Sequence, residues 1–205
     1  MMGPKGKIER RLGEVLNLKA DRSAGPKSPI NRRPTKPGQH GNKRSRKAPS
    51  DFGKQLRETS KFKLTYGIND LTLRRLFAAA SKSKGDVGAK LMQLFESRLQ
   101  NVVYRSGLTP SRLASRAAII NGHIKVNGRR TVSPGYLVKK GDVVSVREES
   151  RSKGQFKNLA EDVKRIEVPS WISVDGAKME AKILAAPENI EHRFEINLLV
   201  ESFSK

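Results

Sequence analysis

The spacing of apolar residues predicts that the middle of the chain is helical. After Ser50, apolar residues recur every three to four positions, which is the spacing of one face of an α-helix. Ser50 or Asp51 can cap a first helix, a second is expected over 71–81, and a third runs from Val87 to a stop at 106–107. The expected packing residues of the three helices are Phe52, Leu56 and Phe62; Leu71, Leu73, Leu76 and Phe77; and Leu91, Leu94, Phe95, Leu99 and Val102.

A further helix is expected after the third. Thr109 can cap it, Pro110 suits its first turn, and Gly122 can end it in a left-handed conformation. Arg112 and Arg116 lie four residues apart and are expected on its exposed face. The expected buried stripe consists of Leu113, Ala117 and Ile120.

Beyond this helix the period changes to two, which is typical of strands. Ile124 and Val126 alternate with polar residues, and the Asn-Gly pair at 127–128 is a strong hairpin signal. A second hairpin is expected between residues 137–138 and 143–146, which a Lys-Gly-Asp turn separates. The pattern therefore predicts a small antiparallel sheet beside helices.

Positive charge is concentrated in the same part of the chain. Residues 98–147 contain ten Lys or Arg and one acid, Asp142. No carboxylate stands at helical spacing from Arg112 or Arg116, so their face is expected to be free to bind phosphate. A compact positive module of this kind favours a nucleic-acid backbone as its partner.

The strings RLQNVVYRSG (98–107) and SRLASRAAIINGHIKVNG (111–128) resemble the RNA-binding module of the bacterial-type ribosomal protein four of the small subunit. That module also occurs in tRNA synthetases, pseudouridine synthases and a small heat-shock protein, so alone it indicates structured RNA. The rest of the chain resembles the ribosomal family in the same order, through PGQHG (37–41), SDFGKQLRE (50–58), PSWISVDGAKMEAK (169–182) and LLVESFSK (198–205). Asn121 stands where the family commonly has His, and the first thirty-odd residues match poorly.

The resemblance implies a structural constituent of the small ribosomal subunit that binds the five-prime domain of its ribosomal RNA and nucleates assembly. It also implies contact with ribosomal protein five of the small subunit and with messenger RNA on its path into the subunit. Lys43, Arg44, Arg46 and Lys47 match the basic segment credited with the messenger contact. Some relatives repress their own messenger.

Composition supports an RNA partner independently. The net charge is +22, and a polyanion would relieve the self-repulsion. No apolar run is long enough to cross a bilayer, and the absence of an Arg- and Ser-rich presequence favours a ribosome of the bacterial cytoplasm over an organellar one. Cysteine is absent, and His40, His123 and His192 are isolated, so we expect no metal and no cofactor.

Together these patterns predict an α+β protein made of a mainly helical domain and a small RNA-binding module. Residues 1–49 are expected to form a basic, largely irregular extension, in which 27–50 carries eight Lys or Arg and no acid. Residues 50–91 would form the helical domain and 92–169 the module. A more balanced tail, 170–205, would pack back on the helical domain.

The candidate RNA-binding residues are basic or polar side chains from the extension, the first helix and the module. They are Arg32, Arg33, Gln39, His40, Lys43, Arg44, Arg46, Lys47, Lys54, Arg57, Lys61, Arg105, Arg112, Arg116, Asn121, His123, Lys125, Asn127, Arg129 and Arg130. Several have simpler readings: the lysines and arginine of the first helix could form an ordinary solvated face, His123 could be a half-buried strand residue, and Asn127 could serve only the turn. Tyr66 and Tyr104 could stack on bases or pack internally, and Trp171 is expected in the core.

Catalysis finds no support in the sequence. The carboxylate pairs at 148–149 and 161–162 have no positioned histidine or metal ligand nearby, and no phosphate-cradling glycine loop occurs. We therefore expect no catalytic residue and no small-molecule substrate. The alternatives are an RNA-modifying enzyme that carries the same module and a non-ribosomal RNA chaperone or nucleoid-type binder.

Overall fold

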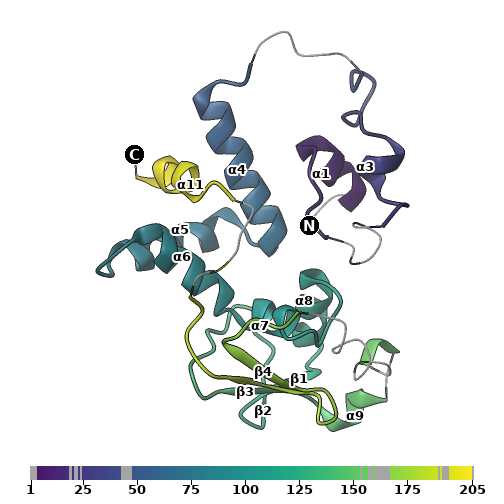
Figure 1. Cartoon of the computed structure of the whole chain (residues 1–205), viewed down its shortest axis with the longest axis vertical. Coiled ribbons are helices and arrows are strands. Elements are labelled where there is room, and N and C mark those ends of the chain that lie inside the picture. The colour runs from purple at the N-terminus through teal and green to yellow at the C-terminus, as the bar shows by residue number, and fades with distance from the viewer. Residues whose placement is uncertain are drawn as a thin grey trace. The chain divides into compact units, whose positions relative to one another are not determined.

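The computed structural model describes residues 4–18, 20, 23, 25–42, 48–152, 154–156, 159, 167–188, 190 and 194–204. The chain forms two compact units (Figure 1). The first consists of Met1–Phe77 with His192–Lys205, and the second of Ala78–Glu191.

The first unit is helical in its described residues. Its helices are α1 (Lys5–Leu12), α3 (Pro29–Arg32), α4 (Asp51–Tyr66), the start of α5 (Asp70–Ser81) and α11 (Ile196–Phe203). The Ser50 hydroxyl accepts a hydrogen bond from Gly53 N–H and caps α4, which confirms the prediction for that helix start. Gly67, at φ 63°, ends the helix in the left-handed conformation that glycine favours.

An aromatic cluster forms the core between α4 and α11. Phe62 is fully buried, and its ring centroid lies 4.7 Å from that of Tyr66 and 5.0 Å from that of Phe194. The expectation that Phe52 and Leu56 pack with Phe62 is wrong, because they are 73% and 54% exposed. Helix α11, which packs on α4, has only eight residues. The apolar period of α4 does not show how much of α4 so short a helix covers.

The second unit combines helices with a sheet, which confirms the α+β class. Its helices are α6 (Val87–Glu96), α7 (Leu99–Arg105), α8 (Arg112–Ile120), α9 (Glu148–Arg151) and the 3-10 turn Gly154–Phe156. Its strands are β1 (Ile124–Val126), β2 (Arg129–Arg130), β3 (Val143–Val146), β4 (Ile172–Asp175) and β5 (Glu180–Ile183). The strand order is β2-β1-β3-β5-β4, and every pairing is antiparallel.

The expected third helix is two helices. The chain breaks at Ser97 and Arg98, where Arg98 has an extended ψ of 136°. Here Leu99 N–H donates to the Tyr136 carbonyl (2.8 Å) and Val138 N–H donates to the Ser97 carbonyl (2.8 Å). Hydrogen bonds to a distant loop thus replace helical hydrogen bonds at this point. The apolar stripe of α6 continues into α7, so the spacing of apolar residues does not reveal the break.

Helix α8 begins later and buries a different face from the one predicted. Ser111, not Thr109, caps it by accepting from Ala114 N–H. The expected stripe is wrong, since Ile120 is 50% exposed. The buried residues are Ser115, Ala118 and Ile119. Ser115 is polar, so the apolar pattern did not place it on the buried face. Its hydroxyl lies 2.5 Å from the Thr109 hydroxyl, so its burial leaves no unpaired polar group.

The first predicted hairpin is confirmed and the second is wrong. Asn127 and Gly128 have φ of 49° and 78°, and they connect β1 to β2 in a tight turn. Residues 137–138 form no strand, and β3 pairs instead with β1 and β5. Residues 172–183, which the sequence pattern assigned to the tail, form β4 and β5 of the same sheet. The β1–β3 and β3–β5 pairings join segments far apart in sequence, so local patterns do not encode them.

Helices α7 and α8 cover one face of the sheet (Figure 1). Their buried side chains interlock with alternate residues of the strands, and Trp171 is 8% exposed, which confirms its place in the core. The helix residues of this core are Leu99, Val102, Val103, Ala118 and Ile119, and the strand residues are Ile124, Val126, Val144, Val146, Ile172, Ala181 and Ile183. The core fixes α8 and β1 relative to each other, and β2 pairs with β1.

Candidate nucleic-acid interface

The two arginines of α8 have different surroundings. Arg116 is exposed. The Arg112 side chain is only 14% exposed, its Nε donates to Asn101 Oδ1 (2.8 Å), and its guanidinium lies 4.5 Å from the ring centroid of Tyr104. The prediction that both arginines lie on an exposed face is therefore wrong for Arg112.

A buried carboxylate explains the difference. Glu96, at the end of α6, is 1% exposed and accepts from Arg105 Nε (3.1 Å) and Nη2 (3.3 Å). Its Oε1 also lies 3.9 Å from Arg112 Nη2. Glu96 lies on α6, so helical spacing along α8 could not reveal it. The side chains of Arg105 and Arg112 thus interact with Glu96 of the same chain, and these contacts hold α7 and α8 against α6.

Arg98 adds a cation that sequence reasoning did not select. Its residue is 9% exposed, and its guanidinium packs against Gly135 in the loop that crosses the α6–α7 junction. Burial lowers the pKa of the Arg98 guanidinium, and the positive charge of nearby Arg116 lowers it further. The proximity of two like charges makes this side of the module attractive to an anion. The count of charges in 98–147 contained the signal, since it included Arg98.

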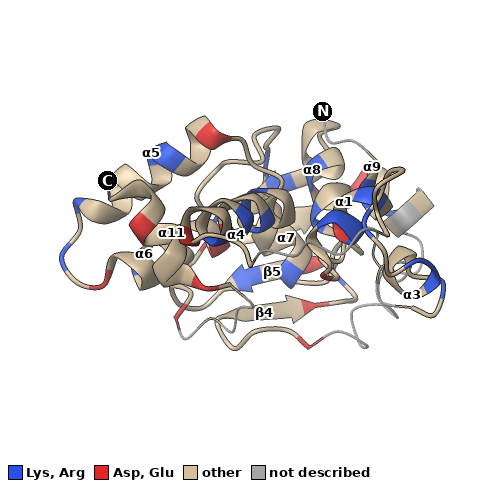
Figure 2. Cartoon of the chain, turned by 90° about the horizontal axis from the view of Figure 1, so that it is seen from above, with Lys and Arg blue, Asp and Glu red and all other residues tan. Residues whose placement is uncertain are grey.

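The β1–β2 hairpin presents exposed cations at the sheet edge. Arg129 and Arg130 are exposed and Lys125 is half-buried. The Arg130 guanidinium lies over Gly122, so closely that a Cβ at Gly122 would clash with its Nε. The hairpin therefore lies against the turn that follows α8. Figure 2 shows the positive residues of the chain in blue.

Two of the polar candidates in this region form hydrogen bonds within the protein. Asn127 donates through Nδ2 to Asp142 Oδ1 (2.8 Å) and accepts through Oδ1 from Val143 N–H (2.8 Å). His123 is half-buried, with its Nδ1 2.9 Å from the Ser150 hydroxyl. The simpler readings of both residues thus have structural support. Asn121 is exposed.

The cations of α4 are mostly paired within the first unit. Lys61 is 6% exposed, and its Nζ lies 2.7 Å from Glu14 Oε2. The expectation that Lys61 lies on an open binding face is therefore wrong. Lys54 pairs with Asp51 at 2.9 Å, and Nη2 of Arg57 donates to the carbonyl of Leu12. Both of these side chains remain exposed.

The extension presents four of its candidates to solvent. Arg32, Arg33, Gln39 and His40 are exposed, and Gln39 Nε2 lies 3.2 Å from His40 Nε2. The other four candidates lie outside the described residues; they are Lys43, Arg44, Arg46 and Lys47.

Of the three tyrosines, only one presents a large surface. Tyr66 is 3% exposed in the aromatic core, and Tyr104 lies under the Arg112 guanidinium. Packing is therefore the reading that the structure favours for both. Tyr136 is 41% exposed, in the loop beside Arg98. Sequence reasoning did not consider Tyr136, which stands in a turn-rich string without an apolar period.

Other kinds of site are not evident in the part of the chain that the structure describes. No helix there is both long and apolar enough to cross a membrane. The same residues contain no cluster of three or more His, Cys, Asp or Glu side chains that could hold a metal ion.

A small antiparallel sheet, two helices on one face and a cationic edge define an RNA-binding module of the S4-domain class. Residues 97–144 match the family described as the S4 domain, and residues 1–96 match the family described as the ribosomal protein S4/S9 N-terminal domain. Small ribosomal subunit protein uS4 of Halothermothrix orenii is 42% identical over 205 residues, which cover 99% of this chain and 98% of that protein. The protein of the same name from Thermus thermophilus is 42% identical over 206 residues, covering 100% and 98%.

The chain therefore belongs to the uS4 family of small ribosomal subunit proteins. The family consists of structural, non-enzymatic proteins, in agreement with the absence of catalytic motifs from the sequence.

Proposed function

We propose that this protein is a structural constituent of the small ribosomal subunit and binds its ribosomal RNA through the S4 module. The observation that supports this most strongly is the set of exposed arginines on α8 and the β1–β2 hairpin, with Arg130 lying against the turn after α8. These arginines are Arg116, Arg129 and Arg130. The hydrophobic core includes residues of α8 and β1, and β2 pairs with β1.

The binding mechanism is electrostatic attraction combined with recognition of RNA shape. A-form RNA hides its base edges in a deep groove and exposes phosphates and 2′-hydroxyls. Arginine guanidinium groups on a rigid frame can meet phosphates at fixed separations without rearrangement, which limits the entropy lost on binding. Recognition is therefore of a folded RNA and not of a base sequence.

The finer assignments come from the family resemblance. In this proposal the RNA partner is the five-prime domain of the small-subunit ribosomal RNA, and binding early in assembly nucleates folding of that domain. Ribosomal protein five of the small subunit and messenger RNA are further partners, with residues 43–47 serving the messenger. The ribosome in question is that of a bacterial cytoplasm.

Sedimentation of a cell lysate through a sucrose gradient tests the proposal. The protein should sediment with the small subunit at physiological salt and detach when the RNA is digested. A protein found only at the top of the gradient, and binding DNA as well as RNA, would instead be a free chaperone or nucleoid-type binder.

A further inference from the structure

The S4 module contains two Asn-Gly pairs, at 121–122 and 127–128. An asparagine that precedes glycine is prone to deamidation, because glycine has no side chain to hinder the reaction. The backbone nitrogen of the glycine loses its proton and attacks Cγ of the asparagine, and ammonia leaves with the side-chain nitrogen. Water then opens the resulting succinimide ring at either of its carbonyls, which leaves aspartate or isoaspartate.

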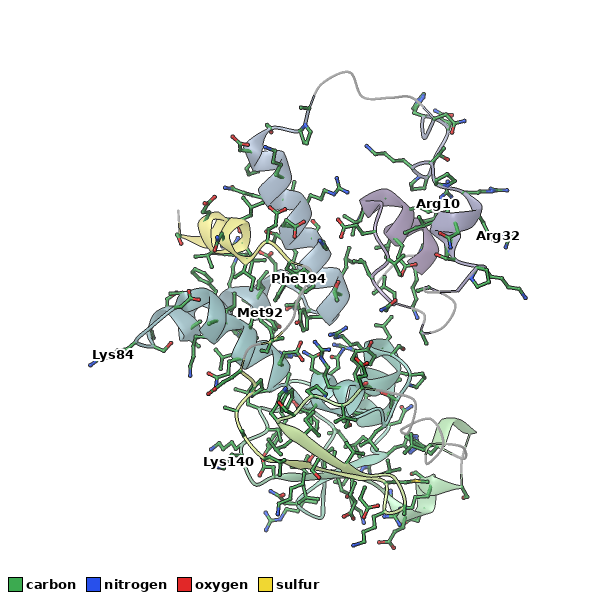
Figure 3. The ribbon with its side chains drawn as sticks, viewed as in Figure 1. Arg10, Arg32, Lys84, Met92, Lys140 and Phe194 are labelled. Atoms are coloured by element: carbon green, nitrogen blue, oxygen red, sulfur yellow. The ribbon has the colours of Figure 1, made fainter. Side chains whose placement is uncertain are left out.

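The pair at 127–128 is held in a way that opposes this reaction. Asn127 Nδ2 donates to Asp142 Oδ1 (2.8 Å), and Asn127 Oδ1 accepts from Val143 N–H (2.8 Å). These bonds fix the side-chain amide toward β3, and turning its Cγ to Gly128 would break both of them. The Asp142 carboxylate would also repel the negative charge that forms on the attacked amide. Lys140 marks the loop that contains Asp142 in Figure 3.

The pair at 121–122 has no such restraint on its side chain. Asn121 directly follows α8 and is exposed. Among the residues that the structure describes, none forms a hydrogen bond with its side-chain amide. The N–H of Gly122 donates to the carbonyl of Ile119 (2.9 Å). This bond closes the last turn of α8, and helix ends fray, so local opening frees the Gly122 nitrogen without unfolding of the core.

A guanidinium lies directly over the glycine of this pair. A Cβ at Gly122 would clash with the guanidinium of Arg130, and Gly122 is buried although Asn121 is exposed. A positive charge this close stabilises the deprotonated Gly122 nitrogen and the oxyanion that forms on Asn121 during the attack. The charged group that contacts the first pair is thus a cation, whereas the group bonded to the second is a carboxylate.

We propose that Asn121 is a spontaneous deamidation site of the folded protein and that Asn127 is protected from the same reaction. Water is the only co-reactant, and ammonia is the product that leaves. The carboxylate formed at position 121 would pair with the Arg130 guanidinium and so neutralise one exposed cation of the module. Weaker RNA binding is the expected consequence, and that consequence rests on the proposed function.

Peptide mapping by mass spectrometry can follow each site separately, because trypsin divides the two pairs between two peptides. Cleavage after Arg116, Lys125 and Arg129 gives peptide 117–125, which contains Asn121, and peptide 126–129, which contains Asn127. Full-length protein is incubated near neutral pH, either in buffer or in guanidinium chloride, and the deamidated fraction of each peptide is measured with time. A sample digested at time zero corrects for deamidation during digestion.

The unfolded protein supplies the intrinsic rates. Both pairs follow a β-branched residue, so in guanidinium chloride they should deamidate at similar rates. In buffer, peptide 117–125 should deamidate at least about tenfold faster than peptide 126–129, because the two hydrogen bonds of Asn127 must break first. Asp142→Ala should narrow this difference, with circular dichroism to verify the fold. Equal rates for the two peptides of the folded wild type, or an intact peptide 117–125, would overturn the proposal.

Two single variants of β2 test the part played by Arg130, and they lose the same charge. Arg130→Gln should slow deamidation of Asn121 by a factor of about two to five, as for the loss of one exposed charge contact. Arg129→Gln leaves the guanidinium over Gly122 in place and should keep the wild-type rate. Equal rates in the two variants would contradict the electrostatic role assigned to Arg130.

Asn121→Gln separates the modification from the proposed function. Glutamine has one more methylene, which disfavours ring closure, so this variant should stay unmodified. Each protein is compared with itself before and after incubation, by its affinity for a transcript of the small-subunit ribosomal RNA. Only the wild type should lose affinity, and its log-log salt slope should fall by about 0.7–0.9 if Arg130 is neutralised.

Deamidated wild type with unchanged RNA affinity would contradict the pairing of the new carboxylate with Arg130. If the fresh wild-type protein fails to bind the transcript, the proposed function fails. The peptide map needs no RNA, so it still decides whether Asn121 deamidates, and the two failures are thereby distinguished.

Discussion

Arg112 and Arg116, one turn apart on α8, should separate stability from RNA binding. Arg112 is bound within the protein by Asn101, Tyr104 and the edge of Glu96, whereas Arg116 is exposed. We expect Arg112→Ala to destabilise the fold and to leave the RNA affinity of the folded molecules nearly unchanged. Arg116→Ala should do the opposite. The two variants lose the same side chain and the same charge, so each is the control for the other.

The magnitudes follow from the contacts. A hydrogen bond from a charged group contributes about 1.5–3 kcal/mol, and a cation–π contact about 0.5–1 kcal/mol. Because Arg112 makes both and Glu96 keeps its pairing with Arg105, we expect Arg112→Ala to cost about 2–4 kcal/mol of unfolding free energy. One lost phosphate contact at Arg116 corresponds to about five- to eightfold weaker binding at 0.1 M salt.

Urea unfolding gives the first quantity, and titration of labelled ribosomal RNA with protein of known folded fraction gives the second. The reasoning is refuted if Arg112→Ala unfolds at the wild-type urea concentration while its RNA affinity falls. It is also refuted if Arg116→Ala loses stability and keeps its RNA affinity, because Arg116 would then have the structural role assigned to Arg112.

Three further predictions concern the fold and its requirements. Ile119→Ala should cost about 2–5 kcal/mol and Ile120→Ala less than about 1 kcal/mol in urea unfolding, since Ile119 is fully buried and Ile120 is half exposed; equal losses would contradict the buried face of α8. Gly122→Ala should cost about 1–2 kcal/mol, because φ is 74° and the new Cβ would displace the Arg130 guanidinium; unchanged thermal unfolding would argue against that turn. Chelation with EDTA should change neither folding nor RNA binding, because cysteine is absent, and stoichiometric zinc in the purified protein would contradict this.

Local signals in the sequence predicted local structure well. The cap at Ser50, the end of α8 at Gly122 and the Asn127–Gly128 turn are each specified by a few adjacent residues, and all three are confirmed. The predictions failed where contacts between segments distant in sequence determine the structure. The loop at Tyr136 splits the third helix, and β5 replaces the expected partner of β3.

The candidate site was predictable as a surface and less so as a set of residues. Charge density located the module, and Arg116 and Arg129 are exposed as expected. Helical spacing could not reveal that Glu96 pairs with Arg112 or that Glu14 pairs with Lys61, because both acids come from other segments. A count of charges shows where cations gather, whereas only the fold shows which of them the protein already neutralises.

The central claim is that the module recognises folded small-subunit ribosomal RNA through phosphates and shape. Its most direct test is the dissociation constant of the purified protein for a transcript of the small-subunit RNA and for large-subunit RNA of equal length, each measured across a salt series. The account predicts steep salt dependence for both and much tighter binding of the small-subunit transcript at every salt concentration. A shallow salt slope, or equal affinity for the two RNAs, would contradict it.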